Sequence, residues 1–286
     1  MTANLTTEKR LAPTLSAQGG AEIPAIGFGT SSLGGSAAEL VATALRLGYR
    51  HIDTAWKYGT ERGVGEGLRT SGVPRQEIFL TTKVSHEYLH AADFARSVDE
   101  SLRNLGVDYV DLLLVHWPEK NTPLAETMAA LARAKRQGLA RHVGVANFNI
   151  AMLDEAMALC PEPLVTLQVE CHPYLDQSKV IEACRRRGLV LTAYCPLARG
   201  RLTSDPVLTD IGRRHGKTCA QVALRWLMQQ DVIAAIPRSS NAARVAENID
   251  VFDFKLDDDE MRRIGTLKRR DGRTANPVGR APVWDV

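Results

Sequence analysis

The sequence predicts an α/β fold of the (β/α)8 TIM-barrel type, and three observations predict it. Seven short apolar runs each end on a polar or aromatic residue, and these residues are Asp53, Lys83, His116, Asn147, Gln168, Tyr194 and Arg238. Helical stretches that close on glycine precede several runs, at Gly48, Gly106, Gly138 and Gly188, because glycine accepts the left-handed conformation that ends a helix. The length of 286 residues suits a fold that takes roughly 250 residues.

The strands are expected where the apolar runs lie. The first is predicted at residues 25–29, and the others at 49–53, 78–83, 109–116, 142–147, 165–168, 189–194 and 232–238. Consecutive apolar positions such as 112–115 are typical of strands that are buried on both faces. An open, doubly wound sheet is the alternative, but no G-x-G-x-x-G motif follows the first strand.

Helices are expected between the strands. Ser36 and Glu39 form a capping-box pattern at the start of the first helix. A later helix carries an apolar stripe, formed by Phe94, Val98, Leu102 and Leu105. Further helices are predicted at residues 61–71, 124–137, 150–159, 177–187, 218–230 and 241–249, with an additional helical segment at 205–215.

The whole chain, residues 1–286, is predicted to form one domain. Residues 1–12 are expected to be a flexible N-terminal extension. Residues 14–26, with Gly19 and Gly20 between two short runs, predict a β-hairpin that could plug the bottom of the barrel. Beyond Lys268 we expect a short C-terminal tail.

Composition and charge exclude several classes of protein. The net charge of +3 is small and the basic residues are dispersed, so we expect no nucleic-acid partner. The five cysteines are odd in number and form no C-x-x-C motif, which argues against a disulfide framework or a metal site. The sequence has no apolar run of ~20 residues and no signal-peptide pattern, so we expect no membrane partner. These observations predict a cytoplasmic protein, which we expect to be a monomer.

Four titratable residues at neighbouring strand ends predict the chemistry. Tyr58 follows Asp53 by five positions, while Lys83 and His116 end the next two runs. A phenol is a poor acid at neutral pH, with an unperturbed pKa near ~10, so a buried ammonium beside it would help. That ammonium needs an anion, which Asp53 can supply, and an imidazole can bind the same substrate oxygen. Each residue alone could be an ordinary cap or core polar group, but together they suit the reduction of a carbonyl.

These four residues resemble, one by one, the catalytic tetrad of the aldo-keto reductases. The resemblance runs from about Pro24 to Asp285, and the segment 144–148 resembles the family's G-x-S-N-F motif. It implies an NADPH (NADP+) cofactor, a nicotinamide bound by Gln168 and stacked on Tyr194, and a 2′-phosphate and adenine held after the last strand. The cofactor-binding residues that the resemblance implies are Asn147, Gln168, Tyr194, Pro196, Leu197, Pro237, Arg238, Ser239, Ser240, Arg244, Glu247 and Asn248.

The phosphate assignment has independent support, because Arg238, two serines and a helix start at Asn241 are groups that phosphates bind. Two positions depart from the family's pattern. Ala146 replaces a serine, which removes a hydrogen bond worth about 0.5 to 1.5 kcal/mol. Arg238 replaces a lysine and changes a point charge to a planar fork.

The segments 72–75 and 280–285 resemble a subgroup of the family, the bacterial 2,5-diketo-D-gluconate reductases. If the tail folds over the barrel mouth, Trp56, Trp117 and Trp284 would wall the substrate pocket with flat, partly polar surfaces. Such a pocket favours small polar carbonyl compounds, either keto-sugar acids such as 2,5-diketo-D-gluconate or dicarbonyls such as methylglyoxal.

The sequence therefore predicts an NADPH-dependent oxidoreductase that reduces aldehydes or ketones to alcohols. In this hypothesis Tyr58 donates the proton, Lys83 is its electrostatic partner, Asp53 pairs with Lys83, and His116 orients the carbonyl. One alternative is a regulatory or structural barrel that binds NADPH with little turnover. Another is an isomerase or aldolase that uses Lys83 as a Schiff base.

Overall fold

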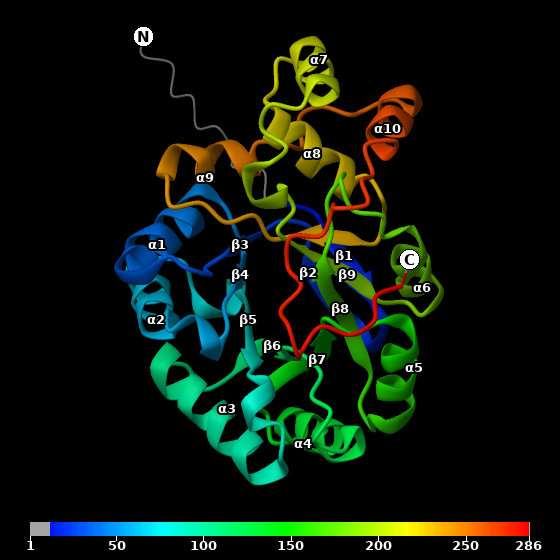
Figure 1. Ribbon diagram of the computed structural model, residues 1–286. Helices are drawn as coiled ribbons and strands as arrows, with labels where there is room; N and C mark the ends of the chain where they lie inside the picture. The colour runs from blue at the N-terminus through cyan, green and yellow to red at the C-terminus, as the bar shows by residue number, and fades with distance from the viewer. Residues whose placement is uncertain (1–11, 286) are drawn as a thin grey trace.

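Eight parallel strands form the barrel in the order of the chain (Figure 1). The structure is a computed structural model that describes residues 12–285. The strands are β3 (Gly27–Gly29), β4 (His51–Asp53), β5 (Phe79–Val84), β6 (Val110–Val115), β7 (Ala140–Ala146), β8 (Leu164–Glu170), β9 (Val190–Tyr194) and β10 (Ile233–Ala235). A parallel bridge between Ile26 and Ala235 joins the first and last strands. The predicted (β/α)8 barrel is confirmed.

Helices cover the outside of this barrel (Figure 1). Those that connect or follow the strands are α1 (Ala37–Leu47), α2 (Glu61–Thr70), α3 (Ala91–Leu105), α4 (Leu124–Arg136), α5 (Ile150–Leu159), α6 (Ser178–Arg186), α8 (Cys219–Met228) and α9 (Ala242–Ile249). Two more, α7 (Pro206–His215) and α10 (Asp258–Gly265), pack against α8 and against each other. Asp205 caps α7 by accepting hydrogen bonds from the amides of Val207 and Leu208. No helix among residues 12–285 is both long and apolar enough to span a membrane.

The predicted helix ends and apolar stripe are confirmed. The four glycine stops have positive φ, from 65° at Gly106 and Gly188 to 111° at Gly48. The stripe of α3 is buried against the barrel at Phe94, Val98, Leu102 and Leu105. The predicted capping box at Ser36 is wrong, because Ser36 ends a 3-10 turn (Gly34–Ser36) and its helical backbone leaves the hydroxyl without a capping hydrogen bond.

The predicted strands differ from the structure mainly at their ends. His116 and Asn147 directly follow β6 and β7, so both still lie at the mouth of the barrel. The run at 232–238 is longer than its strand, since β10 ends at Ala235. Pro237 has no amide hydrogen for the sheet, and Arg238 lies three residues beyond the strand.

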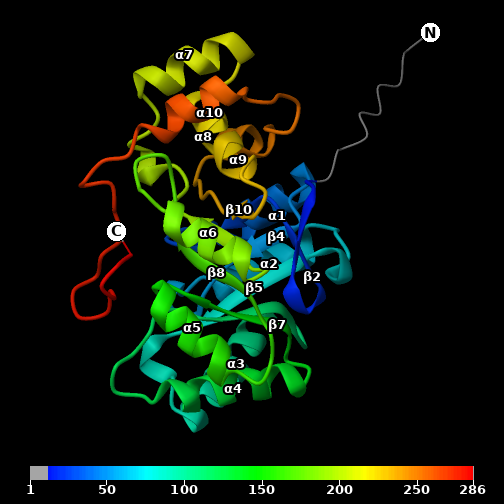
Figure 2. The same ribbon diagram turned by 90° about the vertical axis from the view of Figure 1, so that its right-hand side faces the viewer.

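The predicted hairpin is confirmed as β1 (Thr14–Ala17) and β2 (Ala21–Pro24), which pair antiparallel. Ala21 and Ile23 are fully buried and share a cluster with Leu112 and Leu114, so the hairpin closes the bottom of the barrel. Figure 2 shows the hairpin at one end of the barrel and the C-terminal tail at the other. The predicted N-terminal extension lies outside the described residues up to residue 11, and the assignment of 1–286 to one domain stays a prediction.

Candidate active site

One cavity of about 840 Å³ opens at the C-terminal ends of the strands. Its walls include fifteen of the predicted site residues: Asp53, Tyr58, His116, Asn147, Gln168, Tyr194, Pro196, Leu197, Pro237, Arg238, Ser239, Ser240, Arg244, Glu247 and Asn248. Trp117 also lines it, whereas Lys83, Trp56 and Trp284 do not. The structure therefore brings the predicted catalytic and cofactor residues to one cavity, with Lys83 behind its wall.

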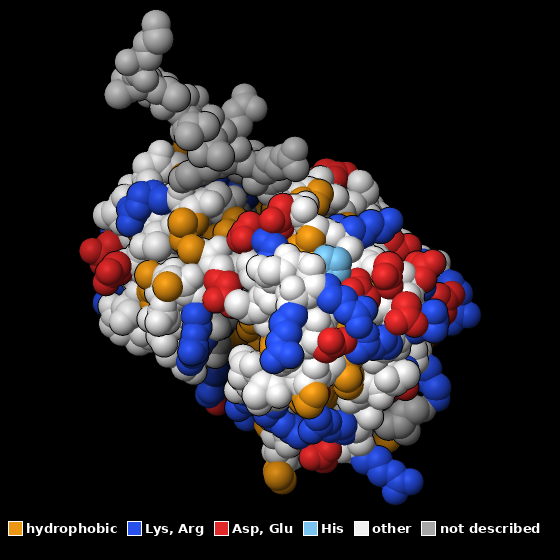
Figure 3. Space-filling model, turned by 90° about the horizontal axis from the view of Figure 1, so that it is seen from above, with side chains coloured by type: hydrophobic (Ala, Val, Ile, Leu, Met, Phe, Trp, Pro, Cys, Tyr) orange, Lys and Arg blue, Asp and Glu red, His pale blue; other side chains and the backbone are white. Residues whose placement is uncertain are grey.

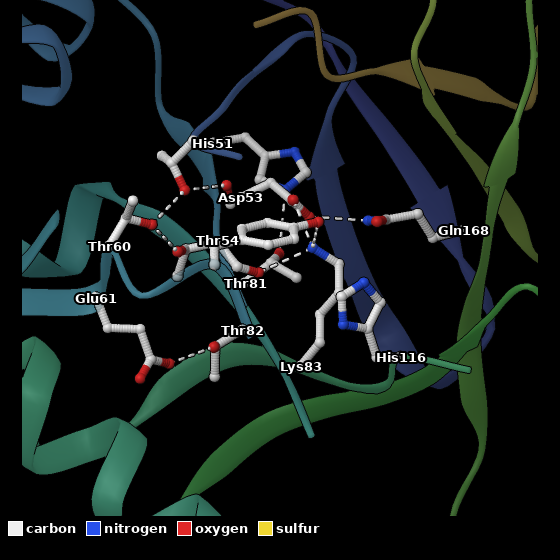
Figure 4. A network of polar contacts seen from close by, with 12 residues as sticks. His51, Asp53, Thr54, Thr60, Glu61, Thr81, Thr82, Lys83, His116 and Gln168 are labelled. Atoms are coloured by element: carbon white, nitrogen blue, oxygen red, sulfur yellow. Dashed lines mark hydrogen bonds and ion pairs between the residues drawn. The ribbon is translucent and has the colours of Figure 1, made fainter. Parts of the chain in front are cut away.

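A buried ion pair joins β4 and β5 in this site. Lys83 Nζ lies 2.5 Å from Asp53 Oδ1, and the two side chains are only 0% and 2% exposed. The ammonium also donates to the carbonyl of Thr54 at 2.8 Å (Figure 4). Burial lowers the pKa of Lys83, and Asp53 opposes that shift. The pair meets because Asp53 aligns with Thr81, two residues before Lys83 on the same inward face of β5.

Tyr58 lies above this pair, at the end of a 3-10 turn (Trp56–Tyr58) that follows β4. Its hydroxyl is 3.5 Å from Lys83 Nζ, and its ring packs edge-on against His116 with the centroids 5.5 Å apart. Burial, and next the charge of Asp53, raise the pKa of Tyr58 well above its usual value. We expected the Lys83 ammonium to lower the pKa of Tyr58, but burial and Asp53 outweigh that effect. The phenol therefore keeps its proton at neutral pH.

His116 is an uncharged hydrogen-bonding group in this site. Burial, and next the positive charge of Lys83, hold the pKa of His116 well below its usual value. Its imidazole is therefore neutral at physiological pH, and a neutral ring can donate one N–H to a substrate oxygen. This matches the role that the sequence predicts for His116, which stays a prediction.

Three predicted nicotinamide-binding residues form hydrogen bonds with the predicted tetrad or with one another. Gln168 Nε2 donates to Asp53 Oδ2 at 2.8 Å. Tyr194 donates its hydroxyl to Asn147 Oδ1 at 2.7 Å, while Asn147 Nδ2 donates to the carbonyl of His116 at 2.8 Å. Asn147 has a φ of 64°, a left-handed conformation that asparagine tolerates better than most residues. The sequence did not predict the bond between Gln168 and Asp53, which crosses the barrel.

The opposite end of the cavity carries cationic and hydrogen-bonding groups. Arg238 Nε donates to the carbonyl of Ser31 at 2.8 Å, and within residues 12–285 its guanidinium forms no ion pair with a carboxylate. Asn241 caps α9 by accepting from the amides of Ala243 and Arg244. Glu247 accepts a hydrogen bond from Thr218 at 2.7 Å. A positive side chain beside a helix N-terminus is suited to an anion such as phosphate.

Polar residues on the far side of the tetrad were not singled out from the sequence. His51 lies one layer below Asp53, with Nε2 3.1 Å from the hydroxyl of Thr81. Glu61 accepts from the hydroxyl of Thr82 at 2.7 Å (Figure 4). Burial raises the pKa of Glu61. For His51 the available signal is a polar residue two positions before Asp53 in a short strand, whereas Glu61 lies on α2, where no strand alternation marks it.

The three tryptophans occupy different places. Trp117 lines the cavity, and its ring lies 6.2 Å from that of Trp284, so the tail does reach the mouth. Trp56 instead packs edge-on against Tyr88 at 4.8 Å. Their predicted contact with substrate stays a prediction. Among residues 12–285, no group of three or more His, Cys, Asp or Glu side chains is arranged to hold a metal ion.

The barrel brings an ion-paired lysine, a tyrosine and a histidine to one end of a cavity whose far side is cationic. This arrangement is that of a carbonyl-reducing oxidoreductase. The match to a family model over residues 25–269 agrees, and the chain belongs to the aldo/keto reductase family. The predicted family is confirmed.

Known relatives are similar over nearly the whole chain. The methylglyoxal reductase DkgB of Escherichia coli O157:H7 is 40% identical over 92% of this chain and 99% of its own. A crystal structure provisionally described as 2,5-diketo-D-gluconic acid reductase B is 47% identical, with a TM-score of 0.93 over 97% of this chain and 99% of its own. An aldo-keto reductase of Bombyx mori in complex with NADP is 32% identical, with a TM-score of 0.85 over 91% and 94% of the two chains.

Proposed function

We propose that this protein reduces small polar aldehydes or ketones with NADPH, with dicarbonyls or keto-sugar acids as its substrates. One observation carries the proposal: the Tyr58 hydroxyl, beside the Lys83–Asp53 pair, opens on the same cavity as Arg238 and Arg244. The similarity to a methylglyoxal reductase and to the diketogluconic acid reductase structure supports this choice of substrates.

The residues that are present fit an NADPH cofactor. Gly29 of β3 lines the cavity, and the residues that follow β10 offer Arg238, Ser239 and Ser240 to a 2′-phosphate. The backbone amide of Arg244 donates to Asn241, but its guanidinium makes no hydrogen bond or ion pair with another of residues 12–285, so the guanidinium is available to an anion. At the other end Asn147 and Gln168 would hold the carboxamide. When bound, the nicotinamide supplies a hydride to the carbonyl carbon.

The side chains of the tetrad then have distinct tasks. Tyr58 donates its hydroxyl proton to the carbonyl oxygen as the negative charge develops there. Lys83 stabilises the resulting phenolate, since its ammonium lies 3.5 Å from that oxygen. Asp53 keeps the ammonium in place, and neutral His116 orients the carbonyl by a hydrogen bond.

The Schiff-base alternative is disfavoured by the surroundings of Lys83. Three oxygens surround Nζ, from Asp53, Thr54 and Tyr58. An amine that donates to all three is protonated and has no lone pair for a carbonyl carbon. The remaining alternative, a barrel that binds NADPH without useful turnover, is decided by assay.

The experiment is to follow NADPH and NADH consumption with a panel of dicarbonyls, keto-sugar acids and simple aldehydes. Tyr58→Phe should lower kcat by roughly 10² to 10⁴-fold, because general acid catalysis is typically worth that much. The affinity of Tyr58→Phe for NADPH should be unchanged. The matched control is Tyr109→Phe, which removes a hydroxyl that accepts a hydrogen bond from Arg141. No turnover on any member of the panel, or normal turnover by Tyr58→Phe, would contradict the proposal.

We also propose that the protein acts in the cytoplasm as a monomer. Its five cysteines, all free, suit a reducing compartment. Size-exclusion chromatography with light scattering tests the monomer, and a dimeric mass would contradict it.

A further inference from the structure

Glu170 is a buried carboxylate that the catalytic tetrad does not use. It ends β8, two residues after Gln168, so both side chains point to the same face of the strand. Gln168 reaches Asp53, whereas Glu170, one rung nearer the mouth, aligns with Tyr194 of β9. The side chain of Glu170 is 0% exposed.

Four donors surround this carboxylate, and three of them belong to the C-terminal tail. Oε1 accepts from the amide and the hydroxyl of Thr274 at 2.8 and 2.5 Å, and Oε2 accepts from the amide of Ala275 at 2.8 Å. The fourth donor is His172 Nε2, 3.1 Å from Oε1. Burial opposes ionisation, but these hydrogen bonds outweigh it and lower the pKa of Glu170 to about 2. The tail thus replaces the water that an ionised carboxylate needs.

The same tail segment contributes to the wall of the cavity. Ala275 itself lines the cavity. Arg273 places its guanidinium over the ring of Trp284 at 3.8 Å, and Trp284 Nε1 donates to Asn276 at 2.9 Å. Trp284 in turn packs on Trp117, which also lines the cavity. The position of this wall therefore depends on where residues 273–276 are held.

Before residues 274–275, Arg201 donates to Asp271 and the amide of Arg269 donates to the carbonyl of Tyr174; beyond them, the tail has one more attachment. Asn149 donates to the carbonyl of Val283 at 2.9 Å, and Asp285 accepts from the amide of Ile150 at 2.9 Å. These bonds lie at the N-terminus of α5, where the Asn149 contact is exposed to water. Hydrogen bonds to a fully buried charge are stronger than exposed ones, so between these two contacts the Glu170 contact is the stronger anchor of residues 273–285.

We propose that Glu170 is a positioning residue for carbonyl reduction: its buried carboxylate binds the tail at Thr274 and Ala275 and thereby sets the substrate wall formed by Ala275 and Trp117, with Trp284 packed behind Trp117. The expected change in KM rests on the proposed reductase function. The attachment of the tail to Glu170 does not depend on that function. Glu170 does not touch the reacting atoms, and its role in this proposal is to hold the tail.

The test compares Glu170→Gln with wild type. Glutamine keeps the shape but turns one oxygen into a donor, which faces amides that also donate. We expect KM for the best carbonyl substrate to rise about tenfold, with kcat and the NADPH Kd nearly unchanged, because only the fraction with a docked tail binds substrate well. Trypsin should cleave after Arg273 and Arg280 at least about tenfold faster, as the open fraction grows.

Two further variants serve as graded and matched controls. Thr274→Val removes one of the four donors and should raise KM and the cleavage rate by a smaller factor in the same direction. Glu22→Gln changes a carboxylate that accepts from Thr14 and Ser16 on the hairpin, far from the mouth, and should change neither quantity.

The outcomes separate this inference from the proposed function. Wild-type KM and cleavage rates in Glu170→Gln would overturn it, as would equal losses of kcat, substrate affinity and NADPH affinity, which indicate general damage. If Glu170→Gln does not fold by circular dichroism, an unchanged Thr274→Val overturns it. If wild type has no turnover, the proposed function fails, and the cleavage rates alone decide whether Glu170 holds the tail.

Discussion

Replacing Asp53 with asparagine would leave a fully buried ammonium without its counter-charge. Removing one partner of a buried pair typically costs about 3 to 5 kcal/mol, against up to about 1 kcal/mol for an exposed pair. Lys83 and Asp53 are 0% and 2% exposed, so the larger value applies. The asparagine oxygen can still accept a hydrogen bond from Lys83, and the carbonyl of Thr54 keeps the one that it already accepts. We therefore expect the free energy of unfolding to fall by about 3 kcal/mol.

This loss should depend on pH. Burial already lowers the pKa of Lys83, and without Asp53 it falls further. The unfolded lysine titrates near ~10.4, so between the folded and unfolded pKa values the unfolded state binds more protons. The free energy of unfolding therefore rises with pH in that window. The deficit of the variant is largest at neutral pH and shrinks as the pH approaches ~10.4.

Urea unfolding followed by circular dichroism at pH 7 and pH 10 measures both effects. Glu87→Gln is the matched control, because it breaks an exposed ion pair with Lys57. The side chain of Lys57 is 45% exposed and that of Glu87 is 42% exposed. That control should lose at most about 1 kcal/mol. A loss below about 1 kcal/mol for Asp53→Asn, or one that is equal at the two pH values, would refute the reasoning.

Three other predictions follow from the site. Arg238→Ala or Arg244→Ala should weaken NADPH by about 1.5 to 3 kcal/mol and leave NADH little affected, and equal losses in a fluorescence titration would contradict their contact with the 2′-phosphate. Because the pKa of His116 is well below its usual value, kcat/KM should show no inflection near pH 6.5, which a pH profile between 5.5 and 8 checks. Deleting residues 280–286 should raise KM for small dicarbonyls or keto acids more than the NADPH Kd, and an unchanged KM would show that this part of the tail does not form the pocket.

Much of the fold and of the catalytic group could be predicted because a parallel barrel is buried on both faces. Its strands then appear as apolar runs, and the polar residue that ends each run marks the mouth. This worked for Asp53, Lys83 and His116. It misjudged the run at 232–238, because Ile236 and Pro237 are apolar although the chain has already left the sheet.

The contacts that the sequence did not reveal join residues far apart in the chain. Glu170 and Thr274 are 104 positions apart, and Gln168 and Asp53 are 115 positions apart. No local pattern specifies such a partner, since it depends on how the tail and the opposite strand pack. The alternation of Thr166, Gln168 and Glu170 in an apolar strand was the available signal that these side chains share the inner face.

The two buried carboxylates at the mouth differ in the kind of partner they have. Asp53 is paired with an ammonium that the proposed reaction uses, so its contact depends on the identity of one side chain, Lys83. Two of the three tail hydrogen bonds to Glu170 come from backbone amides, and amides are supplied by whichever residues adopt the same chain path. The anchor therefore depends on the conformation of residues 274–275 more than on their side chains. Exposed tail residues such as Val278, which make no part of it, should accept substitution without moving the substrate wall.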